Sequence, residues 1–131
     1  LEGVSSGRTR VLLVDDETDI TDTLVKILGE QTNYEVRVAA SGFAAGVEAE
    51  RFKPHVMLLD IHLNDGDTKA FVEMVRKSEN LQFTKIVAMS GKLTDGQAYG
   101  LRGQGYDGFL KKPFQVRQVV EAIEAATNLV H

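Results

Sequence analysis

Two short apolar runs that end in aspartate stand out in the pattern of hydrophobic and polar positions. Residues 11–14 (Val-Leu-Leu-Val) precede Asp15 and Asp16, and residues 56–59 (Val-Met-Leu-Leu) precede Asp60. Continuous apolar runs of this length are typical of strands buried on both faces of a parallel sheet. Each run therefore predicts a strand that carries one or two carboxylates to an edge of the sheet.

The other segments alternate between strand-like and helix-like patterns. Strands are predicted at residues 11–14, 34–39, 56–59, 86–89 and 109–110, and helices at residues 20–29, 41–52, around 71–75, 94–102 and 116–123. Apolar residues recur at spacings of three and four in the helical segments. Ser41 is the predicted cap of the second helix, and Pro54 follows its end. Gly96 and Gly100 make residues 94–102 the weakest helix, because glycine costs nearly 1 kcal/mol against alanine.

This alternation predicts an α/β fold with a doubly wound, five-stranded parallel sheet and helices on both faces. With strands numbered along the chain, right-handed crossovers favour the order 2-1-3-4-5. In that order the first and third strands are neighbours, and ligands bind beyond their carboxyl ends. Asp15, Asp16 and Asp60 are therefore expected to converge on one spot.

Converging carboxylates require a positive partner, because two like charges at 4 Å repel by about 4 kcal/mol at an effective dielectric constant near 20. Mg²⁺ fits such a cluster, since it prefers one or two carboxylates together with water and substrate phosphate. Lys111 or Lys112 is a second candidate cation. A carboxylate beside a metal can also attack phosphorus and form an aspartyl phosphate. Ser90 and Lys112, which follow the fourth and fifth predicted strands, are then placed to bind the phosphoryl oxygens.

Composition narrows the range of functions. The chain has 131 residues, a net charge of -4 and no cysteine. One domain is expected at this length, and the absence of a basic stripe argues against direct binding of nucleic acid. Without cysteine there is no disulfide and no thiolate metal site, which agrees with a cytoplasmic location. No apolar stretch reaches the roughly 18 residues of a membrane span. Residues 1–7 are interpreted as a linker or cloning remnant, residues 8–128 as the domain and residues 129–131 as a tail.

Four motifs, taken together, resemble the receiver domain of two-component response regulators over about residues 8–128. They are Val14-Asp15-Asp16-Glu17, Leu58-Leu59-Asp60-Ile61-His62-Leu63, Ala88-Met89-Ser90-Gly91 and Leu110-Lys111-Lys112-Pro113-Phe114. The resemblance implies the flavodoxin-like receiver fold. It also implies a regulatory phosphoacceptor domain, whose only chemistry is its own phosphorylation and dephosphorylation, rather than an enzyme.

The resemblance also assigns roles to individual residues. Asp60 would accept a phosphoryl group from a histidine kinase or a phosphotransfer protein. Asp15, Asp16, Asp60 and the main-chain carbonyl of His62 would hold Mg²⁺. Ser90 and Lys112 would bind the phosphate, and the Lys112–Pro113 bond would be cis.

The output implied by the resemblance is a change of surface. Movement of Ser90 would be coupled to Phe109, and the face made by the fourth helix, the fifth strand and the fifth helix would change shape. The partner would be a downstream effector protein, or an effector domain of a longer protein. Dimerisation through the last two helices stays open.

The chain departs from the family pattern in one loop and at one switch position. Asn64 stands where a proline is frequent, and Thr68 replaces a frequent glycine, so the shape of this loop is an open question. Phe109 lacks the hydroxyl of the more familiar tyrosine and is expected to act by packing alone. His55 is expected to serve in packing or at the surface.

Other functions remain as alternatives. A degenerate receiver would bind a partner without being phosphorylated. A phosphatase that uses an aspartyl phosphate needs a second acid two residues after the nucleophile, where this chain has His62. Flavin binding is disfavoured, because the first strand–helix turn lacks a phosphate loop rich in serine, threonine and glycine. Residues 103–108 match the dinucleotide fingerprint Gly-x-Gly-x-x-Gly, but they follow a predicted helix and lead into a strand, so we reject that reading.

Overall fold

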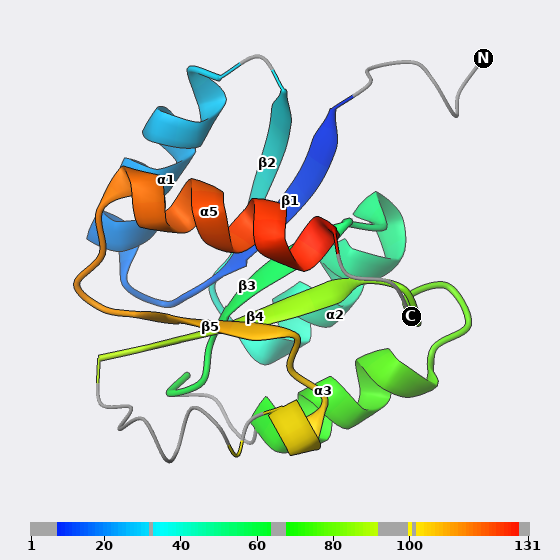
Figure 1. Cartoon of the computed structure of the whole chain (residues 1–131). Coiled ribbons are helices and arrows are strands. Elements are labelled where there is room, and N and C mark those ends of the chain that lie inside the picture. The colour runs from blue at the N-terminus through cyan, green and yellow to red at the C-terminus, as the bar shows by residue number, and fades with distance from the viewer. Residues whose placement is uncertain (1–7, 32, 64–67, 92–99, 101, 129–131) are drawn as a thin grey trace.

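The computed structural model describes residues 8–31, 33–63, 68–91, 100 and 102–128. Five parallel strands form one sheet in the order β2-β1-β3-β4-β5, as the sequence predicts (Figure 1). The strands are β1 (Thr9–Val14), β2 (Tyr34–Ala39), β3 (Val56–Asp60), β4 (Lys85–Ser90) and β5 (Gly108–Lys111). The helices are α1 (Thr18–Gly29), α2 (Gly42–Phe52), α3 (Thr68–Lys77) and α5 (Val116–Thr127), with a short 3₁₀ helix η2 (Arg102–Gln104).

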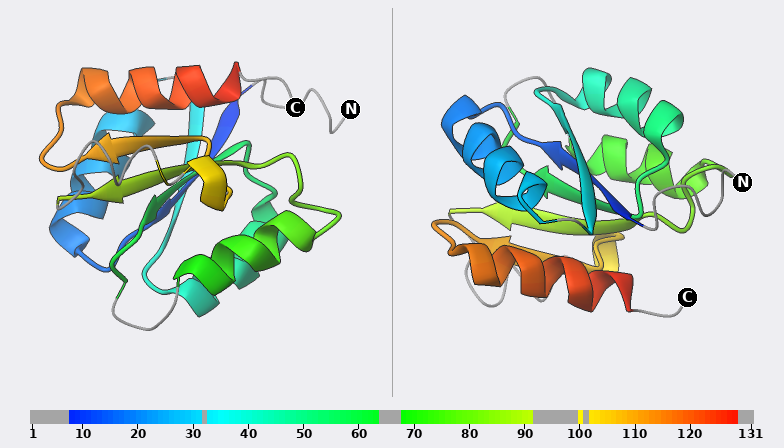
Figure 2. Two further views of the ribbon diagram at one scale, coloured as in Figure 1. Left: turned by 60° about the horizontal axis from the view of Figure 1, so that its bottom comes forward. Right: turned by 90° about the horizontal axis from the view of Figure 1, so that it is seen from above.

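Alternate residues of the buried strands feed two separate cores. Leu12, Met57 and Ile86 pack with α2 and α3 on one face of the sheet. Val11 and Leu58, which point to the other face, pack with α1 and α5. Figure 2 shows α5 on one side of the sheet and α2 and α3 on the other. The apolar runs lack a polar alternation because both faces of these strands are covered.

The register of the sheet brings the carboxyl ends of its strands to one edge. Val14 of β1 pairs with Leu59 of β3, so Asp15 and Asp60 follow from neighbouring positions. At the next interface Asp60 pairs with Met89, which places Ser90 one residue further along β4. The predicted adjacency of the first and third strands is confirmed.

The ends of α2 follow the local chemistry of the sequence. The Ser41 hydroxyl accepts a hydrogen bond from the Ala44 amide at 3.1 Å, which is the predicted N-cap interaction. After the helix, Lys53 adopts a left-handed backbone conformation with φ of 49°, and Pro54 comes next. The predicted bounds of this helix are confirmed.

The loop after β3 and the segment after β4 are described only in part. Asn64 and residues 94–99 of the predicted fourth helix lie outside the described residues. Thr68 begins α3, and its hydroxyl donates to the Ile61 carbonyl at 3.3 Å. At residues 102–104 the chain forms η2, and β5 begins at Gly108. The segment with the dinucleotide pattern therefore enters a strand, and the rejection of that pattern is confirmed.

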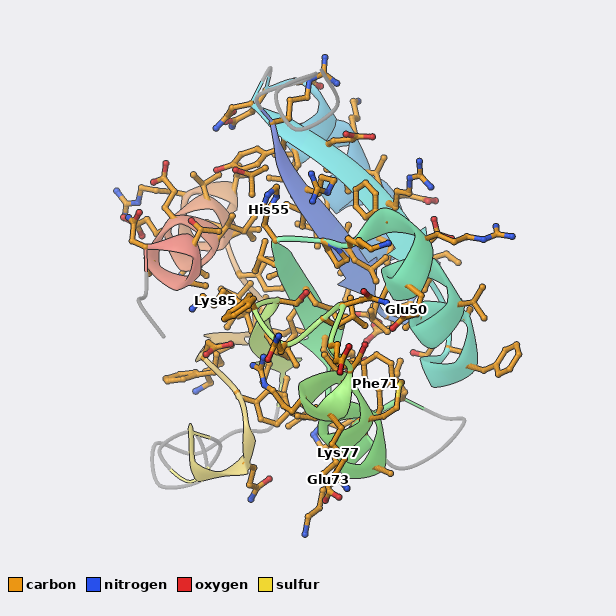
Figure 3. All side chains as sticks on the ribbon, turned by 90° about the vertical axis from the view of Figure 1, so that its right-hand side faces the viewer. Glu50, His55, Phe71, Glu73, Lys77 and Lys85 are labelled. Atoms are coloured by element: carbon orange, nitrogen blue, oxygen red, sulfur yellow. The ribbon has the colours of Figure 1, made fainter. Side chains whose placement is uncertain are left out.

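Polar contacts tie the outer elements to the sheet. In Figure 3, Glu50 projects from α2, where its carboxylate accepts hydrogen bonds from Ser78 at 2.9 Å and from Asn80 at 3.1 Å. His55, also labelled there, accepts the Arg10 amide hydrogen on Nδ1 at 2.8 Å. Burial and the Arg10 charge lower the pKa of His55, which agrees with a neutral ring that accepts this bond. His55 is an exposed residue, so of the two positions that the sequence analysis expects, packing or the surface, the structure supports the surface.

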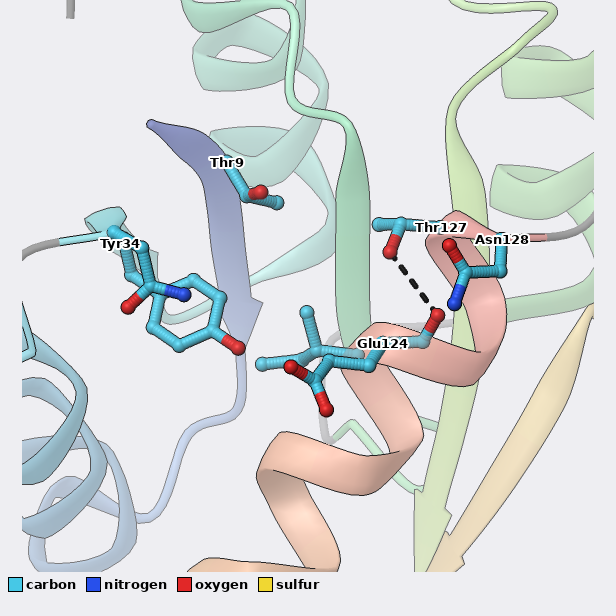
Figure 4. A pocket seen from close by; sticks show the side chains of 7 residues that line it. Thr9, Tyr34, Glu124, Thr127 and Asn128 are labelled. Atoms are coloured by element: carbon cyan, nitrogen blue, oxygen red, sulfur yellow. Dashed lines mark hydrogen bonds between the residues drawn. The ribbon is translucent and has the colours of Figure 1, made fainter. Parts of the chain in front are cut away.

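A polar pocket of about 370 Å³ lies at the amino ends of β1 and β2, the opposite edge from Asp15 and Asp60. In Figure 4 the Tyr34 ring extends from β2 toward Glu124 of α5. The Tyr34 hydroxyl is buried and has no hydrogen-bond partner among the described residues. Among those residues, moreover, no helix is both long enough and apolar enough to cross a membrane.

Candidate functional site

Three carboxylates meet at the carboxyl edge of the sheet. One oxygen from each of Asp15, Asp16 and Asp60 lies within 4.8 Å of the others. Asp15 and Asp60 are almost completely buried, at 1% and 4% exposure, whereas Asp16 is half-buried. The structure thus brings the predicted acidic cluster together.

Backbone amides fix the two buried carboxylates. Asp15 Oδ1 accepts the amide hydrogen of Glu17 at 2.9 Å, and Asp60 Oδ1 accepts that of His62 at 2.9 Å. Each bond reaches forward two residues, a local turn that aspartate forms readily at the end of a strand. In both residues a backbone amide is hydrogen-bonded to Oδ1, and Oδ2 is directed toward Lys112.

The ammonium group of Lys112 lies among the acids. Its Nζ is 2.7 Å from Asp15 Oδ2, 3.1 Å from Glu17 Oε1 and 3.6 Å from Asp60 Oδ2. The main chain of Lys112 is held by β4, since its amide donates to the Ser90 carbonyl at 2.9 Å. The Lys112–Pro113 bond is cis, as the family resemblance implies. The neighbouring Lys111 is exposed, so Lys112 is the lysine that enters the site.

The pKa directions show the electrostatic balance of the site. Burial raises the pKa of Asp15, and the Asp60 charge adds to this, while Lys112 and the Glu17 amide oppose it. Burial by itself would lower the pKa of Lys112, but the hydrogen bonds to Asp15 and Glu17 and the nearby negative charges outweigh it, so that pKa is raised. One lysine thus faces several acids, and the site retains excess negative charge.

Ser90 and His62 form the side of the site next to β4. Ser90 ends β4 and is fully buried, and its Oγ lies 3.0 Å from Nε2 of His62. Phe109 lies opposite Ala88 in the pairing of β4 with β5, and 43% of its surface is exposed. The predicted switch residues therefore lie on neighbouring strands, with Ser90 inside and Phe109 at the surface.

Two contacts escaped the sequence analysis. Glu17 lies next to the predicted acids in the sequence, yet its carboxylate was given no role, although it binds Lys112. The His62 side chain reaches Ser90, whereas the sequence analysis assigned a role only to the His62 carbonyl. The adjacency of Glu17 to two aspartates was a usable signal. No one-dimensional signal indicates the orientation of the His62 ring.

The donor set fits a hard divalent cation. All three clustered groups are carboxylates, which are oxygen ligands of the kind that Mg²⁺ prefers. Burial is the main cause that raises the pKa of Asp15, and a bound cation would favour its ionised form. The chemistry of the residues therefore agrees with the magnesium ligands named from the sequence.

Comparison with known proteins points to one family. The family model described as "Response regulator receiver domain" matches residues 11–124. The transcriptional regulatory protein TrcR of Mycobacterium tuberculosis is 34% identical over 111 residues, which cover 85% of this chain and 42% of TrcR. The chemotaxis protein CheY of Listeria monocytogenes is 27% identical over 119 residues, which cover 89% of this chain and 98% of CheY.

Solved structures agree with these matches. The chemotaxis response regulator CheY4 of Vibrio cholerae superimposes with a TM-score of 0.83 at 25% identity, covering 91% of this chain and 98% of CheY4. The chain spans about half the length of several of its relatives, among them TrcR at 42% and the response regulator VraR of Staphylococcus saprophyticus at 56%. It spans almost the whole of the chemotaxis proteins.

Proposed function

Because this chain belongs to the response regulator receiver family, we propose that it is a signalling switch controlled by phosphorylation of Asp60. Receiver domains are regulatory signalling domains of two-component systems. The observation that carries the proposal is the convergence of Asp15, Asp16 and Asp60 with Lys112 at one edge of the sheet. The fold and the family match support this proposal.

Asp60 is the acid best placed to accept the phosphoryl group. It ends the central strand β3, and the His62 amide fixes its Oδ1 at 2.9 Å. In the proposed step a carboxylate oxygen of Asp60 attacks phosphorus, and the phosphorus–nitrogen bond of a phosphohistidine donor breaks. The electron pair of that bond stays with the departing ring, which is protonated on its other nitrogen and therefore leaves as neutral imidazole. The product is an acyl phosphate on Asp60.

Lys112 and Ser90 would bind the transferred group. Lys112 Nζ, at 3.6 Å from Asp60 Oδ2, is near enough to neutralise a phosphoryl oxygen without a large movement of the chain. The Ser90 hydroxyl would donate to a second oxygen. Asp15, Asp16, Asp60 and the His62 carbonyl would hold Mg²⁺, which supplies positive charge against the equatorial oxygens.

The output would be a change of surface around β5. The Lys112 amide donates a hydrogen bond to the Ser90 carbonyl at 2.9 Å. A movement of the main chain at Ser90 would therefore also move the main chain at Lys112. We expect Phe109, half-exposed on β5, to respond by repacking. The proposed partners are a cytoplasmic histidine kinase or phosphotransfer protein upstream and an effector protein or effector domain downstream.

Labelling by a small phosphodonor tests the proposal. Incubation with acetyl phosphate and Mg²⁺ should add one phosphate to the intact mass of the wild type and none to that of Asp60→Asn. Asp22→Asn, on the exposed side of α1, is the matched control and should label like the wild type. An unlabelled wild type would favour a constitutive interaction module. Repeated turnover of a phosphate monoester would favour a phosphatase.

A further inference from the structure

A hydrogen bond joins the residue two positions after Asp60 to the serine of β4. Nε2 of His62 lies 3.0 Å from Oγ of Ser90. Ser90 is fully buried, so its hydroxyl requires partners within the protein, whereas the His62 side chain reaches in from an exposed residue. The contact spans 28 positions of the chain and lies beside the proposed phosphoryl site.

Two hydrogen bonds donated by main-chain amides hold the backbone that carries the His62 ring. The His62 amide donates to Asp60 Oδ1 at 2.9 Å. The preceding Ile61 amide donates to the Met89 carbonyl at 3.1 Å, which continues the pairing of β3 with β4. The His62 ring is thus carried by a backbone that is tied to Asp60 and to the strand of Ser90.

The count of donors and acceptors gives this contact a direction. A serine hydroxyl has one hydrogen to donate and two lone pairs that accept, and phosphoryl oxygens can only accept. When a phosphoryl group is bound, the Ser90 hydroxyl must therefore donate its one hydrogen bond to a phosphoryl oxygen. His62 can keep its bond to Ser90 at the same time only if Nε2 carries a hydrogen and donates it to Oγ.

We propose that His62 is a positioning residue, whose Nε2–H donates to Ser90 and directs the serine hydroxyl toward a phosphoryl group on Asp60. The inference rests on the proposed function of Asp60 as acceptor. A donated hydrogen bond to Oγ also makes the hydroxyl a stronger donor, since linked hydrogen bonds polarise one another. His62 acts through Ser90 and has no need to touch the phosphoryl group.

Affinity for beryllofluoride, a phosphoryl mimic, measures this role. In the presence of Mg²⁺ we expect His62→Leu to bind beryllofluoride roughly threefold to tenfold more weakly than the wild type, the range of one lost hydrogen bond. His62→Gln, whose side-chain amide can donate to Ser90, should recover most of that loss. Equal or tighter binding by His62→Leu would overturn the proposal. Equal binding would mean that the ring contributes nothing, and tighter binding would mean that the ring competes with the phosphoryl group for the hydrogen of Ser90.

A double-mutant cycle separates positioning from a general structural effect. In a Ser90→Ala background the change from His62 to Leu should alter beryllofluoride affinity by less than about twofold, because the group through which His62 acts is gone. An undiminished effect would show that His62 acts by another route. Wild-type protein that binds no beryllofluoride would refute the proposed function itself, and with it the role of His62. Wild-type binding with a silent His62→Leu would refute only this inference.

The tautomer of His62 supplies an independent readout. Nitrogen NMR of the protein bound to Mg²⁺ and beryllofluoride should show the His62 ring protonated on Nε2, with its resonances shifted in Ser90→Ala. His55 is an internal reference, because its Nδ1 accepts from the Arg10 amide and its hydrogen must therefore lie on Nε2. Assignment is simple with three histidines in the chain. A His62 ring protonated on Nδ1 would reverse the hydrogen bond and sink the proposal.

Discussion

Arg76 of α3 and Asp107, which precedes β5, form an ion pair with Nη2 and Oδ2 2.7 Å apart. The same guanidinium donates to the Thr84 carbonyl at 2.6 Å and to the Gly105 carbonyl at 2.7 Å. Asp107 Oδ2 also accepts the Ile86 amide at 2.8 Å. One side chain thus joins α3 to the segments that precede β4 and β5, at the edge of the sheet opposite the acidic site.

We expect Arg76→Met to lower the free energy of unfolding by about 2–4 kcal/mol, because Asp107 loses its charge partner and two carbonyls lose a donor. Urea denaturation measures the change. Glu48→Gln is the matched control, since it breaks the exposed Arg37–Glu48 pair at 2.9 Å. That change should cost less than about 1 kcal/mol. Equal losses in the two variants would contradict the importance assigned to Arg76.

Gly105 should resist substitution. Its φ of +98° is in the range that disfavours residues with a side chain, and an added Cβ would lie 3.0 Å from Val72 Cγ1. We expect Gly105→Ala to destabilise the protein by about 1–3 kcal/mol, measured by thermal or urea unfolding. Gly103→Ala is the control, because nothing lies within 4 Å of a Cβ at that position. A stable Gly105→Ala with an unstable Gly103→Ala would refute the explanation.

The Tyr34 hydroxyl gives a prediction with a pH signature. It is buried without a hydrogen-bond partner among the described residues, so Tyr34→Phe should leave stability at neutral pH unchanged or raise it by up to about 1 kcal/mol. Burial and the Glu124 charge raise the pKa of Tyr34 above its ordinary 10.0, while the Asn33 side chain, which is near the hydroxyl but not in hydrogen-bonding geometry, opposes them.

The sign of the pH effect follows from proton binding. Above pH 10.0 the unfolded chain loses the Tyr34 proton while the folded protein keeps it, so the Tyr34 contribution to stability falls as pH rises toward the folded-state pKa. Tyr34→Phe lacks this loss. The stability difference in favour of the variant should therefore widen at alkaline pH, and a constant or shrinking difference would contradict the raised pKa.

Binding of Mg²⁺ should stabilise the folded protein. At a concentration ten times the dissociation constant the gain is about 1.4 kcal/mol, which raises the melting temperature by a few degrees. Asp16→Asn should lose most of this gain while keeping a folded structure, because Asp16 is the least buried of the three acids. Asp22→Asn should respond to Mg²⁺ like the wild type. A magnesium response that survives in Asp16→Asn would place the ion elsewhere.

Lys112→Ala should separate phosphorylation from its consequence. Asp60 keeps its hydrogen bond from the His62 amide, so acetyl phosphate should still label the variant, more slowly. Without the ammonium group the link between the phosphoryl group and β5 is lost, and the NMR shifts around Phe109 should change little on labelling. A response equal to that of the wild type would show that Lys112 does not couple the phosphoryl group to β5.

Local patterns in the sequence are sufficient to predict the strands, most of the helices and the strand order of this protein. Signals a few residues long predict the bounds of β2 at Tyr34 and Ala39, the Ser41 cap and the position of Asp60 at the end of β3. Strand order follows because right-handed crossovers restrict the topology. The convergence of Asp15 with Asp60 then needs no side-chain detail, since adjacent parallel strands end at the same edge.

Relations between side chains that are distant in the sequence were decided by the tertiary structure alone. The sequence analysis named Lys111 or Lys112 as the cation beside the acids, and the structure selects Lys112, which binds Asp15 across 97 positions of the chain. The guanidinium of Arg76 binds groups on two different loops. The direction of the His62 ring and the missing partner of Tyr34 also have no local signal. Rotamers and long-range contacts depend on how the elements pack against one another. A hydrophobic pattern, by contrast, fixes only which face of each element is buried.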